Sequence, residues 1–596
     1  MKLTGKNIFI TVLGFICLCF VTACSSGNSG GDLVTDLSVD VWSGKTASWE
    51  FDGKEVQYEL PQGIRTVELS SKDPVDIFMV KMNVGNTVIP ANSTRYIVSS
   101  STDGRLGGLY SSRAAEEGNL FSEIDDWENV SGISPSGFIR KDYAPARDFV
   151  PPTLVSGSAR TAAAENEQSE PVTPIIPEEG VTKKMLWVDV SDNDTSGLLA
   201  LDGKRYTMRQ ATLQAVGDYC YVWVLDNNFS KDAASGAIID QVAADTLAEQ
   251  FDKMYEPIRA VFGEEADVLY HYRDAIGISE LSDTGTKVNI VVYDIGGDYT
   301  EGQNGGMFGY FHPKDYFTPE SASLHMASTL LCSNNGKYFY VDSGFLNSSP
   351  QMTYSTLAHE FQHMIHHWQK RLAFGYSSST WFNEMMSMVC EDMIQQYLEI
   401  EASNSPISRF AFFGSNYYLS GLTDWLSGND VIISYAGAYA FGAYLARNYG
   451  GKDLITEIAT NDFADQEAIT QALQVIGKNE SFETVFKKYP QALVLDNAPE
   501  GAPSFYKEVP GIGNNDEVMP KIDLTVVGHD NFGNEYPFKP ILLNPDEENR
   551  VDLRPYGFTL HDVVSTNSAG TVNITFSSPV NENEKIYLLV QPRKTN

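Results

Sequence analysis

The sequence predicts a multidomain α+β protein in which a mixed middle region is flanked by β-rich regions at both ends. The chain has 596 residues, which is more than one ordinary domain holds. Its composition, 42% hydrophobic and 20% charged, is that of folded protein. Apolar residues alternate with polar ones near both ends, whereas in the middle they also recur every three or four positions. The first pattern is typical of strands and the second of amphipathic helices.

The N-terminus has the features of a lipoprotein signal peptide, expected over residues 1–23. Two lysines precede an apolar run at 7–21 that is too short to form a stable membrane span. The run ends in VTAC, which resembles a bacterial lipobox and implies cleavage before Cys24 and acylation of that cysteine. Residues 24–32, rich in Ser and Gly, are expected to form a flexible tether. The protein is therefore expected to be exported and lipid-anchored at the bacterial outer membrane or cell surface; the alternative is an ordinary signal peptide ending near a cysteine.

Four further regions differ in composition. Residues 33–110 contain short alternating segments separated by Gly, Pro and Asn, which indicates a β-sandwich-like N-terminal domain. Residues 111–182 are poor in large apolar side chains and are expected to form a low-complexity linker. Residues 183–495 mix expected strands, such as MLWVDV, KVNIVVYDI and KYFYVDSG, with an expected amphipathic helix, IIDQVAADTLAEQFDKMYEPIRAVF. Residues 515–596 return to strand patterns and are expected to form a β-rich C-terminal domain.

Net charge and cysteine content argue against nucleic-acid binding, a disulfide-stabilised fold and a cysteine metal site. The formal charge of −36 repels nucleic acid, so no nucleic-acid partner is expected. Beyond the N-terminal region only Cys220, Cys332 and Cys390 remain, an odd and scattered set. This set provides neither a disulfide framework nor a Cys-x-x-Cys metal site.

The stretch STLAHEFQHMIHHWQKR, residues 355–371, holds four of the nine histidines of the chain. On a helix, His359 and His363 lie on one face a single turn apart, so both imidazoles can reach one metal ion. Glu360 leans toward the same cavity without being needed as a ligand, which suits a general base acting on water held by the ion. Apolar flanking residues predict a buried helix. A surface helix with incidental histidines, the alternative, does not explain those flanks.

A catalytic zinc site needs a third protein ligand. The metzincin pattern requires Gly and His at positions occupied here by His366 and Gln369, so that class is excluded. Glu384, at the start of the expected helix WFNEMMSMVCEDMIQQYLEI, is the candidate. A Gly- and Ser-containing loop between the two helices leaves room for the second helix to return alongside the first.

The pair HEFQH and WFNE resembles the gluzincin metallopeptidases, and within them the hyicolysin-like bacterial secreted peptidases, over about residues 185–490. The resemblance implies a thermolysin-like (gluzincin) catalytic domain with a mixed sheet and active-site helices. It also implies one catalytic Zn²⁺ ion held by His359, His363 and Glu384, with Glu360 as the general base.

One position departs from the thermolysin-like pattern, which has an acidic residue one turn after the glutamate ligand. Met388 stands there in this chain. Ligating histidines usually donate their second N–H to an acceptor. Glu391, seven residues after Glu384 and on the same helical face, is the first candidate for this role, and Asp392 is its rival; both could instead be solvated charges. The other two histidines of the motif helix are expected to flank the site.

The stretch SYAGAYAFGAYLARNYGG, residues 434–451, resembles the Tyr-containing helix that follows the glutamate helix in gluzincin aminopeptidases and their relatives. Amide hydrolysis develops an oxyanion that a positioned donor can stabilise. Tyr435 is the first candidate donor and Tyr439 the second. The alternative is that these tyrosines only pack in a helix core.

Together these features predict a zinc-dependent endopeptidase acting on protein or peptide substrates. The alternative is a cell-surface binding or adhesin lipoprotein built on a metallopeptidase scaffold. An aminopeptidase is less favoured, because residues 305–317 lack the Gly-x-Met-Glu-Asn pattern that anchors a substrate amine. Calcium binding at the acidic run 189–197 is possible but unsupported, since such a run also forms a solvated turn.

Overall fold

The computed structural model describes the chain in segments. They are residues 43–90, 96–100, 104–106, 177–189, 197–200, 204–266, 268–273, 277–283, 287–302, 306–317, 332–513, 518–524, 528–529, 535–536, 540, 542–543, 551–580 and 582–594. The expected signal peptide, the tether with Cys24, most of the linker and most of the acidic run at 189–197 lie outside these segments. Those expectations therefore stay predictions.

A seven-stranded mixed sheet forms the scaffold of the middle region, in the order β14-β15-β13-β10-β9-β7 with β8 paired to β9. The strands are β7 (Lys183–Asp189), β8 (Leu198–Leu199), β9 (Arg205–Val216), β10 (Cys220–Leu225), β13 (Val288–Tyr293), β14 (Gly309–Phe311) and β15 (Tyr338–Asp342). β10, β13 and β15 run parallel, while β14 runs antiparallel to β15. Every residue of β13 is buried, as expected for a central parallel strand. β14 is thus the last strand at one edge of the described sheet.

Helix α2 (Gln241–Phe262) covers part of this sheet and supports the helix that carries the histidine motif. It begins where the Asp240 side chain accepts a hydrogen bond from the Ala243 N–H. Its apolar residues recur every three or four positions, so one face is buried. On that face the rings of Phe251 and Tyr255 lie 5.1 and 5.2 Å from the ring of Phe361, measured between centroids.

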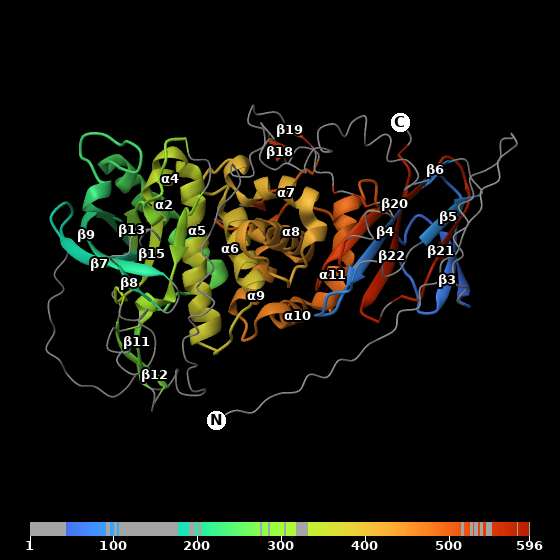
Figure 1. Cartoon of the computed structure of the whole chain (residues 1–596), viewed down its shortest axis with the longest axis horizontal. Helices are drawn as coiled ribbons and strands as arrows, with labels where there is room; N and C mark the ends of the chain where they lie inside the picture. The colour runs from blue at the N-terminus through green and yellow to red at the C-terminus, as the bar shows by residue number, and fades with distance from the viewer. Residues whose placement is uncertain are drawn as a thin grey trace, which may run out of the picture. The chain divides into compact units, whose positions relative to one another are not determined.

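The motif stretch forms α5 (Pro350–His366), which contacts β14 and β15 on one side and α6 (Thr380–Ile394) on another. Pro350 stands in the first turn, where its missing N–H costs no helical hydrogen bond. After α5 the chain makes a π-helical turn, His367–Leu372, and loops back into α6. Figure 1 shows α5 between the central sheet and α6.

The remaining helices complete the helical half of the middle region. They are α4 (Ser343–Ser348), α7 (Arg409–Asn416), α8 (Val431–Tyr449), α9 (Lys452–Thr460), α10 (Asp465–Val475) and α11 (Phe482–Val494). α8 packs closely on α6, because Gly442 has no side chain at the contact. A Cβ at Gly442 would lie 2.6 Å from Val389 Cγ2 and 2.8 Å from Met385 Cγ. Any larger residue there would push the two helices apart.

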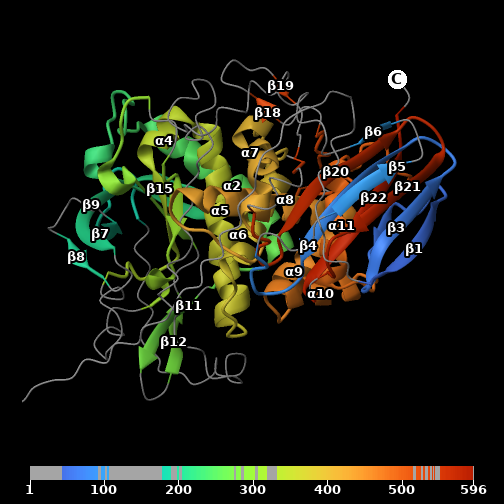
Figure 2. The same ribbon diagram turned by 45° about the vertical axis from the view of Figure 1, so that its right-hand side comes forward.

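The two β-rich end regions, expected as separate domains, join in one β-sandwich. Its strands are β1 (Lys45–Phe51), β2 (Gln57–Glu59), β3 (Ile64–Ser71), β4 (Val75–Asn83), β5 (Tyr96–Ser100), β6 (Gly104–Leu106), β20 (Phe558–Thr566), β21 (Gly570–Phe576) and β22 (Glu584–Pro592). The sheet orders are β1-β3-β21-β5 and β2-β22-β4-β20-β6. Figure 2 shows the blue N-terminal and red C-terminal strands interleaved. Each set supplies hydrogen-bonding edges that the other set needs, so neither forms these sheets alone.

The sandwich also shares a core with the helices. Alternate residues of β4 face opposite sides of its sheet. Ile77 and Met79 pack inside the sandwich, whereas Val80 and Met82 belong to the core that includes the helices.

Three short strand pairs complete the described fold. They are β11 (Val268–Arg273) with β12 (Gly277–Asp283), β16 (Val509–Pro510) with β17 (Val518–Met519), and β18 (Gly528–His529) with β19 (Glu535–Tyr536). Among the helices described, none has the length and apolar character needed to cross a bilayer.

Candidate metal centre

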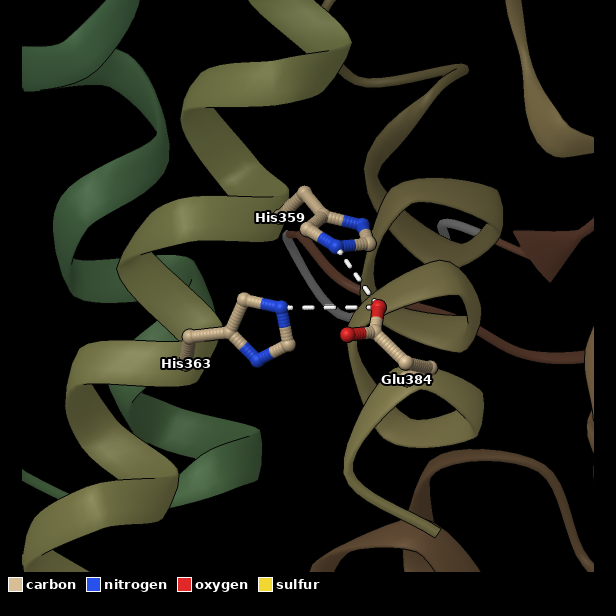
Figure 3. Close-up of side chains that lie close together, drawn as sticks. All are labelled: His359, His363 and Glu384. Atoms are coloured by element: carbon tan, nitrogen blue, oxygen red, sulfur yellow. Dashed lines mark ion pairs between the residues drawn. The ribbon is translucent and has the colours of Figure 1, made fainter. Parts of the chain in front are cut away.

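Helices α5 and α6 bring three ionisable side chains together at their contact. His359 and His363 project from successive turns of α5, with ring centroids 4.6 Å apart and ring planes at 84°. Glu384 projects from the first turns of α6 between them. Its Oε2 lies 3.2 Å from His359 Nε2 and 3.6 Å from His363 Nε2, as the dashed lines in Figure 3 show. The three side chains meet although 20 residues separate His363 from Glu384 along the chain.

The geometry and burial of this cluster fit a divalent metal ion. One ligand atom from each of His359, His363 and Glu384 lies within 4.8 Å of the others. All three side chains are at most 1% exposed. Within the described residues, His363 Nε2 and both carboxylate oxygens of Glu384 form no hydrogen bond of normal geometry. A buried carboxylate without such partners is costly, and a cation held between these atoms would remove that cost.

The electrostatics of the pair also favour a cation. Burial alone would lower the pKa of His363, but the negative charges of Glu384 and Glu360 raise it to about 9. Burial alone would raise the pKa of Glu384, yet the neighbouring imidazoles, His363 first, hold this pKa below its ordinary value. Without metal, the cluster therefore holds a protonated imidazole beside a carboxylate, so one positive charge already sits where the ion would bind.

Each histidine is oriented by a contact at its other ring nitrogen. His359 Nδ1 lies 2.7 Å from Glu391 Oε1, and Ser355 donates its hydroxyl to the second oxygen of Glu391. His363 Nδ1 lies 3.0 Å from Asn383 Oδ1 and close to the hydroxyl of Ser387. With Nδ1–H donating in both rings, each Nε2 faces the cluster, and its lone pair can bind a metal ion once that nitrogen carries no proton.

The two acidic residues considered for orienting a histidine have different partners. Glu391, the first candidate, contacts His359 as described above. Asp392, the rival, instead accepts hydrogen bonds from Arg447 and from the Tyr439 hydroxyl, which lies 2.9 Å from Asp392 Oδ2. Because adjacent helical residues point about 100° apart, Glu391 faces α5 while Asp392 faces α8.

Glu360 is fully buried beside the cluster and lies against the edge strand of the sheet. A Cβ at Gly309 in β14 would stand 3.4 Å from Glu360 Cγ, 2.9 Å from Thr356 Cγ2 and 2.7 Å from the backbone oxygen of Tyr340. Only glycine fits at this point of the strand. The Glu360 side chain therefore lies near β14, and its negative charge acts on His363 of the cluster.

The structure places Tyr435 among other side chains of the helical half. Its ring packs edge-on against Trp425, 5.0 Å away between centroids, and the Arg409 guanidinium lies 5.3 Å from the ring centre. These contacts show how Tyr435 is packed. Its role as an oxyanion donor stays a prediction, as does that of Tyr439, whose hydroxyl is bonded to Asp392.

The other two histidines of the motif lie outside the cluster. His366 Nε2 is 2.9 Å from the Ser378 hydroxyl, and burial lowers the pKa of His366 well below its ordinary value. His367 stacks on the ring of Tyr316 with 6.0 Å between centroids. Both side chains help to hold the end of α5 in place.

Sequence reasoning did not assign Ser355, Asn383 or Ser387, which contact the orienting or ligand side chains. Helical spacing provides the signal that could have found them. Ser355 is four residues before His359, and Ser387 is three residues after Glu384, so each lies on the same helical face as its neighbour. Asn383 stands directly before Glu384, at the end of α6 that faces His363.

Comparisons with known proteins agree with this arrangement. A family model described as Peptidase M30 matches residues 202–530. The chain is also 30% identical over 278 residues to the neutral metalloprotease ShpI of Staphylococcus hyicus. That match covers 44% of this chain and 53% of the relative, so it spans about half the relative's length. Both findings confirm the resemblance drawn from HEFQH and WFNE.

Proposed function

The chain belongs to the peptidase M30 family, and from that premise we propose that it is a zinc-dependent endopeptidase. The observation that carries the proposal is the buried cluster of His359, His363 and Glu384 with Glu360 beside it. The relative of which this chain matches about half is itself named a neutral metalloprotease. A thermolysin-like (gluzincin) arrangement of the catalytic helices is part of the same proposal.

Two imidazole nitrogens and one carboxylate oxygen are a ligand set that catalytic zinc prefers, with one position left for water or substrate. His359, His363 and Glu384 would hold the ion. When bound, zinc would act as a Lewis acid toward the scissile carbonyl and lower the pKa of a water molecule at the open position. The contacts from Glu391 and Asn383 keep the two imidazoles in the orientation that this binding requires.

Glu360 is the residue proposed to move the proton. It adjoins His359 in sequence but is not one of the three residues whose ligand atoms converge. It would accept a proton from the attacking water and pass it to the leaving amine nitrogen, which is the general acid–base role of a positioned carboxylate. Its complete burial limits contact with bulk water.

The edge of the central sheet supports a polypeptide substrate. β14 is the last described strand at that edge, and its Gly309 lies against Glu360. An extended peptide can add to such an edge through main-chain hydrogen bonds.

The single acidic residue in 305–317 is Asp315, which is buried and bound to Lys314 and Tyr340. No carboxylate of that segment is therefore left to anchor a substrate amine, which favours an endopeptidase over an aminopeptidase.

Metal analysis and proteolysis test this proposal. The purified chain should contain about one zinc ion per molecule and cleave casein, and a chelator should abolish both. Readdition of zinc should restore cleavage. His363→Ala should lose the metal and the activity, whereas Val242→Ala, on the exposed side of α2, should retain both. Zinc-free protein that folds but never cleaves casein would instead favour a binding lipoprotein on a peptidase scaffold.

Zinc uptake should be coupled to proton release. Because the pKa of His363 is raised to about 9, this imidazole is protonated at pH 7 in the metal-free chain and must lose its proton to bind metal. We expect release of about one proton at pH 7. The apparent zinc affinity should increase with pH up to about 9 and then level off. Titration calorimetry at pH 7 in buffers of different ionisation enthalpy measures the released protons. Equal heats in all buffers would contradict the expectation.

The N-terminal sequence supports export of the protein. The signal-like residues 1–23 and the lipobox-like sequence before Cys24 support an exported protein that is anchored by lipid at the bacterial surface. The charge of −36 supports protein or peptide partners rather than nucleic acid.

A further inference from the structure

The loop that leads from one ligand-bearing helix to the other is held by α10. Ser379 is the N-cap residue of α6. Its backbone N–H donates to Asp465 Oδ1 at 2.8 Å, and its hydroxyl donates to Asp465 Oδ2 at 2.7 Å. Asp465 is the first residue of α10, 86 positions further along the chain. Both oxygens of this carboxylate thus accept hydrogen bonds from one residue, Ser379, at the start of α6.

A short series of hydrogen bonds connects Asp465 to the metal cluster. The Ser379 carbonyl accepts from the N–H of Asn383 at 3.1 Å, within the first turn of α6. Asn383 Oδ1 in turn lies 3.0 Å from His363 Nδ1. The next residue is Glu384. The carboxylate of Asp465 is therefore hydrogen-bonded to the helical turn that carries both Asn383, which orients His363, and the ligand Glu384.

Asp465 adopts an unfavourable backbone conformation. Its φ is +55°, in the left-handed region where a Cβ is disfavoured and glycine is not. Non-glycine residues held in such conformations concentrate at functional sites. Asp465 keeps this conformation while both of its carboxylate oxygens accept hydrogen bonds from Ser379. This combination indicates that its side chain has a structural role at the start of α6.

The same loop is fixed at its other contacts. The Ser378 hydroxyl bonds to His366 of α5. Before the loop, Lys370 Nζ donates to the carbonyl oxygens of Ile458 and Asn461, at 2.7 and 2.6 Å, at the end of α9. The segment between the ligand helices is therefore attached to the α9–α10 corner at both of its ends, and Asp465 is the attachment nearest to Glu384.

We propose that Asp465 is a positioning residue for the metal centre. By holding Ser379 it fixes the first turn of α6, and so the places of Asn383 and Glu384 opposite α5. The inference rests on the proposed zinc site, and it adds a residue from a separate helix that touches neither metal nor substrate.

The test compares Asp465→Gly with Glu399→Gly in the full chain. Glycine at 465 removes both acceptors but suits the positive φ, so the fold is not strained by the change. Glu399 is a matched control, because it is acidic, exposed and has a φ of +55° beyond the opposite end of α6. Asp465→Gly should weaken zinc binding about tenfold, the lower end of the range for outer-shell partners. The control should bind zinc like the wild type. Competition with a chromophoric chelator measures both.

A second readout does not need zinc. In the metal-free chain, amides in the first two turns of α6 should exchange hydrogen faster in Asp465→Gly than in the wild type or the Glu399→Gly control. Asp465→Asn, which keeps one acceptor oxygen and tolerates positive φ, should fall between them. Unchanged exchange and unchanged zinc affinity in Asp465→Gly would overturn the inference. A wild-type chain that binds no zinc would instead refute the proposed function, while the exchange data would still decide whether Asp465 holds α6.

Discussion

Glu360→Gln should lower kcat/KM for peptide hydrolysis by about 10² to 10⁴-fold, the usual contribution of a general acid–base residue. Glutamine has nearly the size and shape of glutamate and can occupy the same buried space between α5 and β14. It cannot accept a proton at neutral pH. Because Glu360 is not a member of the ligand cluster, zinc binding should persist. The measurement pairs steady-state cleavage of a quenched fluorescent peptide with the zinc content of the same preparation.

The control for this substitution is the same chemical change at a remote site. Glu249→Gln lies on the exposed side of α2 and should leave both activity and metal content unchanged. Full proteolysis by a Glu360→Gln preparation that carries stoichiometric zinc would remove the assigned role of Glu360. Loss of zinc together with activity would show that Glu360 contributes to binding the ion rather than to proton transfer.

Arg447→Ala should destabilise the fold by about 3 to 5 kcal/mol, the usual result of breaking a buried ion pair from one side. The guanidinium of Arg447 donates two hydrogen bonds to Asp392, 2.9 Å from Nη1 to Oδ2 and 3.1 Å from Nη2 to Oδ1. Both side chains are fully buried. The pair connects α8 to α6, so its loss leaves the buried Asp392 carboxylate without its cationic partner. Urea unfolding followed by far-UV circular dichroism measures the change.

Two comparisons define how this result is interpreted. The double variant Arg447→Met with Asp392→Leu removes both charges, so it should recover much of the stability lost in Arg447→Ala. Arg554→Ala breaks a partly exposed pair with Asp424, at 3.2 Å, and should cost less than about 1 kcal/mol. A similar loss of unfolding free energy in Arg447→Ala and Arg554→Ala would mean that the buried pair contributes no more to stability than the partly exposed one.

The sequence could bring His359, His363 and Glu384 together because the signals for this cluster are local. His359 and His363 are related by one helical turn, and Glu391 is related to Glu384 by two, so spacing alone placed them on common faces. The facing of α5 and α6 followed from the short loop between them. Asp465 gave no such signal, since no periodicity relates it to Ser379, 86 residues earlier. Its contribution depends on how α10 packs, which only the folded chain reveals.

The limits of the fold prediction have a similar cause. Alternating apolar residues identified the strands of both end regions, because that pattern depends on each strand alone. It did not identify their partners. β21 inserts between β3 and β5, pairing Val572 with Leu69, and this pairing joins residues about 500 positions apart. Two separate domains were expected for that reason, and one interleaved sandwich was found.

This interleaving has a consequence for how the chain is made. Among the described strands, β1 with β3 is the one ladder that N-terminal strands form among themselves; β2, β4, β5 and β6 all pair with β20, β21 or β22. Because the ribosome makes β20, β21 and β22 after the N-terminal strands, β2, β4, β5 and β6 have no partner strand until residues 558–592 have been synthesised. Such non-local pairing is slow. Until then the strands β2, β4, β5 and β6 lack the partners with which they form hydrogen bonds, so the sandwich closes only when β20, β21 and β22 have been made.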